Sequence, residues 1–330
     1  MPYGRAFAFK ETYRFSKVKM SGKQTYPKVT IIILHLKDIS NLVDCIASLN
    51  KITYQNYNII VVHNGPENIA LRGALSPISQ HISKVIDTEK NLGFAGGNNI
   101  GIRQALKEGA EYILLLNDDT EVAPDFLTNL IEVAEMQQEV GMLGPRIFLY
   151  DQPKKIWFAG ARFDHKTCKI TTAEFENPDK CEGNILESDY ITGCALLVKR
   201  EVVEKIGLLD ERFFLYWEDV DWGLRCIKAG FKNLMVTRSL VWHKASAASG
   251  GMDSLPRVYH KRRSHLLIAR LHAPQTLCKL QRGFFRDIVW LLLKSSDENR
   301  VKKICACLLA IIDYHSGKTG KGPYWIWTNK

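Results

Sequence analysis

The chain has 330 residues, of which 46% are hydrophobic and 24% are charged. This composition is ordinary for a globular protein and excludes a chain that is disordered throughout. The formal net charge of +10 favours anionic partners such as nucleic acid, anionic lipid or a phosphorylated substrate, without choosing among them. The eight cysteines include no C-x-x-C pair, and their spacing indicates no zinc site.

The N-terminal residues carry no recognisable targeting signal. Residues 1–26 are basic and aperiodic, which is typical of a poorly ordered tail, and they lack the continuous apolar segment of a signal peptide. No stretch of the sequence is long and apolar enough to span a bilayer. We therefore expect a cytoplasmic protein, either soluble or peripheral on the cytoplasmic face of the membrane.

The first part of the chain alternates between strand and helix patterns. Runs of β-branched and apolar residues at 29–34, 58–62 and 84–86 are typical of buried strands. A helix between the first two is expected to begin at Ser40, which serves as its N-cap. This alternation predicts a parallel sheet with right-handed crossovers, and hence an α/β fold.

A central apolar run ends in carboxylates. Residues 112–116 read as a strand buried on both faces of the sheet. Asn117, Asp118 and Asp119 follow at the strand end where open α/β sheets bind ligands. A divalent metal with oxygen ligands would relieve the repulsion between adjacent carboxylates. The alternative is a simple turn, in which aspartate is common, leading to a helix after Pro124.

The glycine-rich residues 91–101 open a predicted helix. Such a loop presents backbone N–H groups that a phosphate or ribose can approach. The glycine spacing does not match the dinucleotide-binding fingerprint, and no P-loop lysine follows. A tight turn with close helix packing is the alternative explanation.

The next region is less regular. A short strand is predicted at 140–145, and the polar residues 150–187 are expected to form an insertion or loop layer over one side of the site. Residues 191–198 are predicted to form a strand and 199–206 a helix, which Gly207 ends.

Three acidic residues, Glu218, Asp219 and Asp221, gather at the predicted start of a helix. Acids in a first turn stabilise the helix dipole, which is a sufficient structural explanation. Trp217 and Trp222 lie among them, however, and aromatic rings beside carboxylates suit the face of a sugar.

The last part of the chain is basic and helical. His243 ends a predicted strand, and a lone histidine is more often structural than a ligand. Apolar helices are predicted at 284–293 and 304–312, and they either pack on the main domain, pair with another chain or lie in a membrane interface. We favour packing. The expected divisions are a tail at 1–26, a main domain at 27–250 and a helical extension at 251–330.

Taken together, these motifs resemble the inverting family 2 glycosyltransferases, in particular the rhamnosyltransferase-like and galactofuranosyltransferase-like branch. The resemblance covers about residues 28–249, and the order and separation of the motifs carry it. The matching stretches are 29–34, 59–65, 91–101, 114–120, 193–200, 213–225 and 241–244. It implies a GT-A fold, which is a Rossmann-like nucleotide-binding domain with a mostly parallel central sheet, followed here by C-terminal helices.

The resemblance also implies roles for single residues. Residues 117–119 are similar to the family's metal motif, with Asp119 and His243 as ligands of Mn²⁺ or Mg²⁺. Asp219 is the expected catalytic base, with Glu218 supporting it or contacting the acceptor. The expected nucleotide contacts are His63, Asn64, Asn91, Gly93, Asn98 and Asp118. The expected acceptor or sugar contacts are Trp217, Trp222 and Asp221.

One part of the nucleotide site departs from the family pattern. His63 stands where the family usually has an aspartate that contacts the nucleobase, and His35 and Leu36 replace an asparagine and an aromatic residue. A neutral imidazole still donates or accepts one hydrogen bond. The preferred nucleobase is therefore left open.

The implied activity is metal-dependent, inverting transfer of a sugar from a nucleoside-diphosphate donor. We expect L-rhamnose from a dTDP donor, and a saccharide or lipid-linked saccharide acceptor in cell-surface polysaccharide synthesis. The alternative is a degenerate, non-catalytic module that binds sugar nucleotide, and His63 is its support. The glycine spacing argues against an oxidoreductase, and no nucleic-acid recognition motif is present. The oligomeric state is left open.

Overall fold

The computed structural model describes residues 11–14, 26–172, 184–244, 254–294 and 299–327. The expectation of a basic, poorly ordered tail falls mostly on residues 1–10 and 15–25, which lie outside the described residues. Within the tail, Glu11–Arg14 forms strand β1, which pairs antiparallel with β11 (Asn184–Glu187).

One half of the main sheet is parallel, as the strand and helix alternation predicts. Its strands are β2 (Val29–His35), β3 (Tyr57–His63), β4 (Ile82–Asp87) and β5 (Tyr112–Asn117), in the spatial order β5-β2-β3-β4. In the register of this half, His35 lies opposite His63 and Leu34 lies opposite Asn117. The polar residues at these strand ends therefore share one edge of the sheet.

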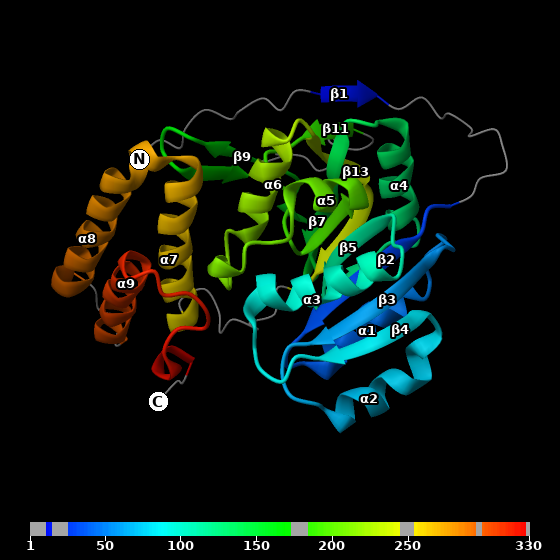
Figure 1. The fold of residues 1–330 in the computed structure, drawn as a ribbon, viewed down its shortest axis with the longest axis horizontal. Coiled ribbons are helices and arrows are strands. Elements are labelled where there is room, and N and C mark those ends of the chain that lie inside the picture. The colour runs from blue at the N-terminus through cyan, green and yellow to red at the C-terminus, as the bar shows by residue number, and fades with distance from the viewer. Residues whose placement is uncertain (1–10, 15–25, 173–183, 245–253, 295–298, 328–330) are drawn as a thin grey trace.

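Helices cover this half of the sheet (Figure 1). They are α1 (Ile39–Leu49), α2 (Ile69–Leu75) and α3 (Gly93–Lys107). The prediction that Ser40 caps α1 is wrong. Asp38 is the N-cap, and its carboxylate accepts hydrogen bonds from the backbone N–H groups of Ser40 and Asn41.

The other half of the sheet mixes directions. Strand β12 (Ala195–Lys199) runs antiparallel between β5 and β7 (Val140–Leu149), and β7 is parallel to β13 (Lys232–His243). The short β6 (Thr120–Val122) pairs with the end of β13, so Thr120 lies opposite His243. This pairing brings the end of β13 to the carboxylates that follow β5.

Residues 150–187 contain more regular structure than predicted. They include β8 (Gln152–Phe158), β9 (Ala161–Asp164), β10 (Lys169–Thr172) and β11. Strand β8 extends the main sheet beside β7, whereas β9 and β10 form a separate hairpin. Residues 173–183 of the predicted loop layer lie outside the described part of the chain.

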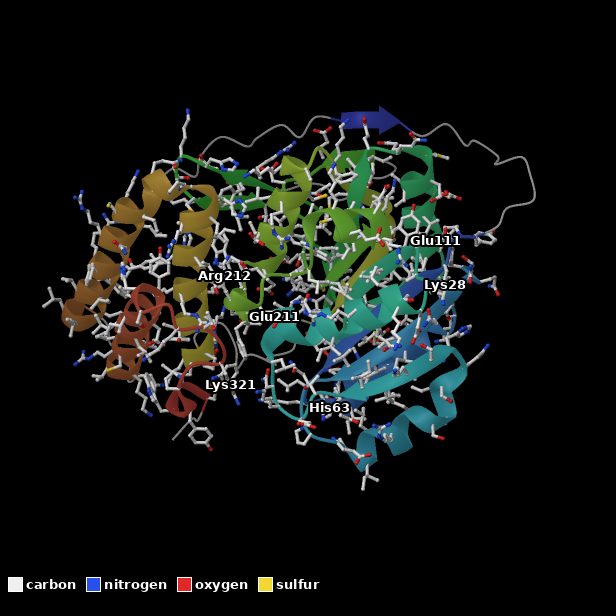
Figure 2. All side chains as sticks on the ribbon, in the orientation of Figure 1. Lys28, His63, Glu111, Glu211, Arg212 and Lys321 are labelled. Atoms are coloured by element: carbon white, nitrogen blue, oxygen red, sulfur yellow. The ribbon has the colours of Figure 1, made fainter. Side chains whose placement is uncertain are left out.

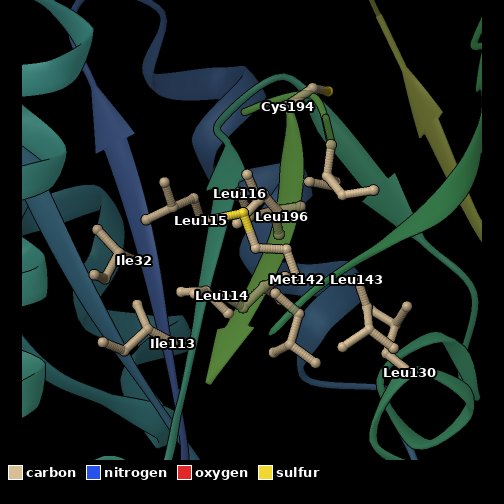
Figure 3. Packing of buried hydrophobic residues seen from close by; sticks show 14 of the residues in the cluster. Ile32, Ile113, Leu114, Leu115, Leu116, Leu130, Met142, Leu143, Cys194 and Leu196 are labelled. Carbon is tan, nitrogen blue, oxygen red and sulfur yellow. The ribbon is translucent and has the colours of Figure 1, made fainter. Parts of the chain in front are cut away.

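The apolar core surrounds β5. Figure 3 shows Leu114, Leu115 and Leu116 between Ile32 on one side and Leu196 on the other. The side chains of β5 are at most 5% exposed from Tyr112 to Leu116, as predicted for a strand with both faces covered. Helix α4 (Phe126–Met136) packs against β7 and β13. Burying each such leucine stabilises the fold by about 1.5–3 kcal/mol.

The C-terminal helices lie together on one side of the sheet (Figure 1). They are α7 (Leu255–His272), α8 (Leu277–Lys294) and α9 (Arg300–His315), so α8 and α9 extend beyond the predicted ranges. They share small apolar clusters, and α7 also contacts α6 (Glu218–Lys228), which supports packing on the main domain. Among the described helices, none has the length and apolarity to cross a membrane.

Candidate active site at the carboxyl edge of the sheet

The turn after β3 is tied to the start of α3 by one amide side chain. Asn64 donates from Nδ2 to the Asn91 side-chain oxygen at 3.2 Å and to the Gly93 carbonyl at 3.0 Å. Its own oxygen accepts from the Leu92 N–H at 2.8 Å. Asn64, Asn91 and Gly93 are therefore held together at the sheet edge. Asn98 is not in this group, because its amide is buried in α3 and donates to the Phe94 carbonyl.

The glycines of this stretch serve close packing. Gly93 has φ +78°, and a Cβ there would meet the Phe214 carbonyl oxygen at 2.3 Å. A Cβ on Gly97 or Gly101 would lie 2.4 Å from Leu34 or 2.5 Å from Ile32, both on β2. The glycine spacing is thus explained by the approach of α3 to the sheet.

Two histidines occupy the ends of β2 and β3. The His35 ring stacks on His63 with 5.5 Å between ring centroids, and its Nδ1 lies 2.7 Å from Asp118 Oδ2. Burial lowers the pKa of His63, so this imidazole is neutral at pH 7. Burial raises the pKa of Asp118, while the hydrogen bond with His35 opposes that change. Figure 2 shows His63 at the opposite end of the parallel strands from Lys28 and Glu111.

Asp119 and His243 meet across the pairing of β6 with β13. His243 Nε2 lies 3.1 Å from Asp119 Oδ1, and both residues are less than 10% exposed. Burial alone would lower the pKa of His243, but Cys194 and Asp119 outweigh burial and raise it. The two residues predicted as metal ligands are therefore brought together.

The spacing of this pair fits a divalent cation. Adjacent ligand atoms of an octahedral shell with bonds of about 2.1 Å lie about 3.0 Å apart, close to the observed separation of oxygen and nitrogen. A carboxylate oxygen and an imidazole nitrogen suit Mn²⁺ or Mg²⁺. The described residues contain no group of three or more His, Cys, Asp and Glu side chains placed to hold a metal. The protein would thus supply only part of a coordination shell.

The predicted acidic pair starts α6. Asp219 Oδ2 accepts from the Gly193 N–H at 3.0 Å, and Oδ1 accepts from its neighbour Val220 N–H at 2.8 Å. Glu218 is 5% exposed, and its Oε2 is buried without a hydrogen-bond partner. Burial and the charge of Asp219 raise the pKa of Glu218 well above its ordinary value. Burial also raises the pKa of Asp219, against its backbone donors.

The segment before this pair is strained and is held by α7. Phe214, Tyr216 and Trp217 all have positive φ, which is uncommon outside glycine and occurs at functional sites. Ser264 donates to the carbonyls of residues 213 and 215 at 3.2 and 3.1 Å. His265 stacks on Trp217 at 4.5 Å. The C-terminal helices therefore fix the loop that presents Glu218 and Asp219.

Two predicted acceptor contacts belong to packing instead. Trp222 is fully buried, and its indole N–H donates to the Gly207 carbonyl at 2.9 Å. Asp221 is 3% exposed and lies 2.7 Å from Arg225 and 2.8 Å from His272. Neither side chain is free to contact a sugar. Trp217 is only partly buried, but its ring already stacks on His265.

The structure adds three residues to the site that the sequence analysis did not predict. Trp157 on β8 packs edge-on against His243, with 4.6 Å between ring centroids, and stays 38% exposed, so it is an aromatic ring beside the Asp119–His243 pair. Cys194 lies close enough to shift the pKa of His243. Gly193 donates its backbone N–H to Asp219, and it packs against the Phe94 ring, which would lie 2.7 Å from an added Cβ. The Thr-Gly-Cys sequence directly before the apolar run 195–198 was the available signal for the last two.

Comparison with known proteins decides the family. The model of glycosyl transferase family 2 matches residues 30–207, which is more than half of the chain. The chain belongs to glycosyl transferase family 2. The matched range of this glycosyltransferase includes the glycine-rich residues 91–101 and Asp119, but it ends before Asp219 and His243.

Curated relatives extend the likeness beyond that range. The glycosyltransferase is 26% identical to dTDP-rhamnosyl transferase RfbF of Shigella flexneri, over 89% of this chain and 97% of the relative. It is 24% identical to N-acetylglucosaminyl-diphospho-decaprenol L-rhamnosyltransferase of Mycobacterium tuberculosis, over 69% and 80%. It is also 22% identical to the galactofuranosyltransferase GlfT2 of that organism, over 57% and 32%. The predicted branch of the family is confirmed.

Solved structures confirm the GT-A fold. A mannosyltransferase from Pyrobaculum calidifontis in complex with GDP-Man and Mn²⁺ has a TM-score of 0.54 at 12% identity, covering 94% of this chain and 90% of that one. GalNAc-T7 with UDP, GalNAc and Mn²⁺ has a TM-score of 0.58 at 17% identity, covering 73% and 48%.

Proposed function

We propose that this glycosyltransferase moves a sugar, with inversion, from a nucleoside-diphosphate donor to a saccharide or lipid-linked saccharide in cell-surface polysaccharide synthesis. The supporting observation is that one sheet edge gathers the nucleotide loop, the Asp119–His243 pair and the Glu218–Asp219 pair. A hydrogen bond of 2.7 Å from the Phe94 N–H to the Phe214 carbonyl joins the first and last of these. L-Rhamnose from a dTDP donor is the proposed sugar. Two relatives that match most of the chain are named rhamnosyltransferases, and the name of one of them includes dTDP.

Asp119 and His243 would hold Mn²⁺ or Mg²⁺. The diphosphate of the donor and water would complete the shell, since the protein contributes so few ligands. When bound, the cation supplies positive charge where the leaving diphosphate becomes more negative. Asp118 lies next to this pair and is oriented by His35 towards the same edge, and we assign it to the ribose or diphosphate.

Asp219 is the proposed base. The charge on one of two adjacent carboxylates makes ionisation of the other less favourable, and the member with hydrogen-bond donors keeps the charge more easily. Backbone N–H groups stabilise an ionised Asp219, whereas Glu218 has an oxygen without a partner and a strongly raised pKa. Asp219 would take the proton of the acceptor hydroxyl as that oxygen attacks the anomeric carbon. Protonated Glu218 would donate a hydrogen bond beside it.

His63 is the proposed contact to the nucleobase. Because burial keeps its imidazole neutral, it offers one donor and one acceptor to a pyrimidine edge. Trp157 is the proposed sugar platform, in place of the buried Trp222. The net charge of +10 suits action at an anionic cytoplasmic membrane face, where a lipid-linked acceptor would be held.

The decisive experiment is calorimetric binding of dTDP, UDP and GDP with and without Mn²⁺. We expect one nucleotide to bind at least about 10-fold more tightly with the metal, and Asp119→Ala to remove that gain. Asp125→Ala removes an exposed carboxylate shortly after the motif and should leave binding unchanged. Failure of all three nucleotides to bind would refute the proposed nucleotide site, and a metal-dependent gain in Asp119→Ala would refute the metal site.

A further inference from the structure

The outer face of α8 changes character along its length. Its inner residues Phe284 and Ile288 are less than 10% exposed and pack with α9. Beyond them, the last turns of α8 present large apolar side chains to solvent. Their exposed fractions are 50% for Val289, 56% for Trp290, 56% for Leu292 and 76% for Leu293. The helix is therefore apolar on all sides near its end, which a helix that packs only on its own domain does not need.

The start of α9 adds to this surface. Gln281 near the start of α8 hydrogen-bonds His315 at the end of α9, so the two helices pack antiparallel. The end of α8 therefore lies at the same end of the pair as the start of α9, where Val301 is 63% exposed. We call Val289, Trp290, Leu292, Leu293 and Val301 the helical tip.

Cations precede the tip on the same face of α8. Lys279, Arg282 and Arg286 are exposed, and successive steps of three, four and seven residues align them with Val289 and Leu293. At 1.5 Å per residue, Arg286 lies about 10 Å before Leu293 along the helix axis. The acidic residue of α8, Asp287, points instead to Arg262 of α7 at 3.6 Å. We call Lys279, Arg282 and Arg286 the cationic collar. On this face of α8 the collar comes first and the apolar end follows it.

We propose that the helical tip inserts into the headgroup region of an anionic bilayer while Lys279, Arg282 and Arg286 bind lipid phosphates. Apolar groups at a membrane interface are buried about 5–10 Å deep, and with the end of α8 directed into the bilayer the tip would reach that depth while the basic residues stay at the headgroups. A tryptophan at such a boundary is common, because its ring is amphipathic. Membrane docking does not require the proposed reaction. Only its purpose, to bring the enzyme to a lipid-linked acceptor, rests on the proposed function.

Charge distinguishes this partner from a second copy of the chain. Two copies joined through their tips would bring two cationic collars towards each other, and like charges across an interface oppose association. An anionic membrane neutralises the same collar. The distribution of charge on α8 therefore favours lipid over self-association.

The test is sedimentation of the full chain with vesicles. One set contains phosphatidylcholine with roughly a third phosphatidylglycerol, and the other contains phosphatidylcholine alone. We expect binding to the anionic set only, weakened on raising the salt from about 0.1 M to about 0.5 M. The double variant Trp290→Glu with Leu293→Glu should lower the partition coefficient at least about 10-fold. Arg282→Glu with Arg286→Glu should do the same.

Ile69→Glu is the matched control, because Ile69 is 82% exposed on α2 in the main domain. It should bind vesicles like the unmodified chain. All variants should keep their melting temperature and nucleotide affinity, which separates loss of docking from loss of the proposed active site. Equal vesicle binding by the tip variant, or no binding by the unmodified chain, overturns the proposal. A dimer in solution that the tip variant abolishes would overturn it in favour of a second copy.

Discussion

Glu218 and Asp219 are neighbours in the chain but have different hydrogen-bond partners. The Gly193 and Val220 N–H groups hold both oxygens of Asp219, while one oxygen of Glu218 is buried without a partner. This contrast makes the two carboxylates experimentally separable, because an amide replaces a protonated carboxyl group better than it replaces an ionised one.

We expect Asp219→Asn to lower kcat by about 10²–10⁴-fold, because the base is lost, while nucleotide affinity stays within about twofold. Glu218→Gln should retain more than about a tenth of the activity, since Gln keeps a hydrogen-bond donor at a site that is protonated. Steady-state transfer assays and calorimetry measure both quantities. A Glu218→Gln enzyme as inactive as Asp219→Asn, or a fully active Asp219→Asn enzyme, would reverse or remove the assignment.

Single residues were predictable where chemistry and position coincide. A buried apolar strand followed by Asp118 and Asp119 identifies the carboxyl edge of the sheet, whichever elements pack over that edge. The environment of Trp222 was not predictable, because Trp217 and Trp222 look alike in sequence and only the packing of α6 buries one of them. Trp157 escaped notice because it lies in a polar stretch without periodicity.

At the scale of elements, the contact of α3 with β2 sets the position of the glycine-rich loop that we propose binds the nucleotide. Gly97 and Gly101 bring the helix backbone against Leu34 and Ile32. Gly73 on α2 offers a comparison, since a Cβ there meets nothing within 4 Å. We therefore expect replacement of glycine by alanine to change the stability of the protein in opposite directions in α3 and in α2.

We expect Gly101→Ala to lower the free energy of unfolding by about 1–3 kcal/mol, because the added methyl group overpacks against Ile32. Gly73→Ala should raise it by about 0.5–1 kcal/mol, because alanine favours the helix and fits the space. Denaturant titration measures both changes. A stabilising Gly101→Ala would show that the close approach of α3 is not required by the fold.

The type of an element, helix or strand, could be predicted from the pattern of apolar residues, but its length could not. Strands such as 29–34 are continuous apolar runs, and a run of that kind has few alternatives. The predicted 284–293 left out the first turns of α8, and the predicted 304–312 left out both ends of α9, because polar residues interrupt the apolar run there. The strands of 150–172 form through pairing with β7 and with each other, which local composition does not reveal.

At the scale of the molecule, we propose a glycosyltransferase unit over 27–250 and a helical extension over 251–330 that are joined through buried contacts. His260 of α7 is fully buried and stacks on Phe214 at 4.9 Å between ring centroids. Burial, and then the charge of Arg263, lowers the pKa of His260 to about 3. Folding therefore keeps this imidazole neutral.

This lowered pKa predicts a loss of stability in acid. The unfolded chain takes up a proton on His260 as the pH falls below about 6.5, whereas the folded chain does not, so the contribution is present above 6.5 and is lost towards pH 3. We expect a slope of up to about 1.4 kcal/mol per pH unit in that window, and a smaller slope in His260→Phe. Unfolding free energies at several pH values measure it. Equal slopes in both proteins would contradict the prediction.

The contacts of α7 with residues 213–217 limit how chimaeras of this enzyme and its relatives can be built. Ser264 and His265 fix the backbone and ring of the loop that precedes Glu218, although they follow the glycosyltransferase unit by many residues. A chimaera joined near residue 250 would keep every residue proposed for metal, nucleotide and proton transfer, and would still lose the helix that holds the loop before Glu218. Helix and loop must therefore be exchanged together.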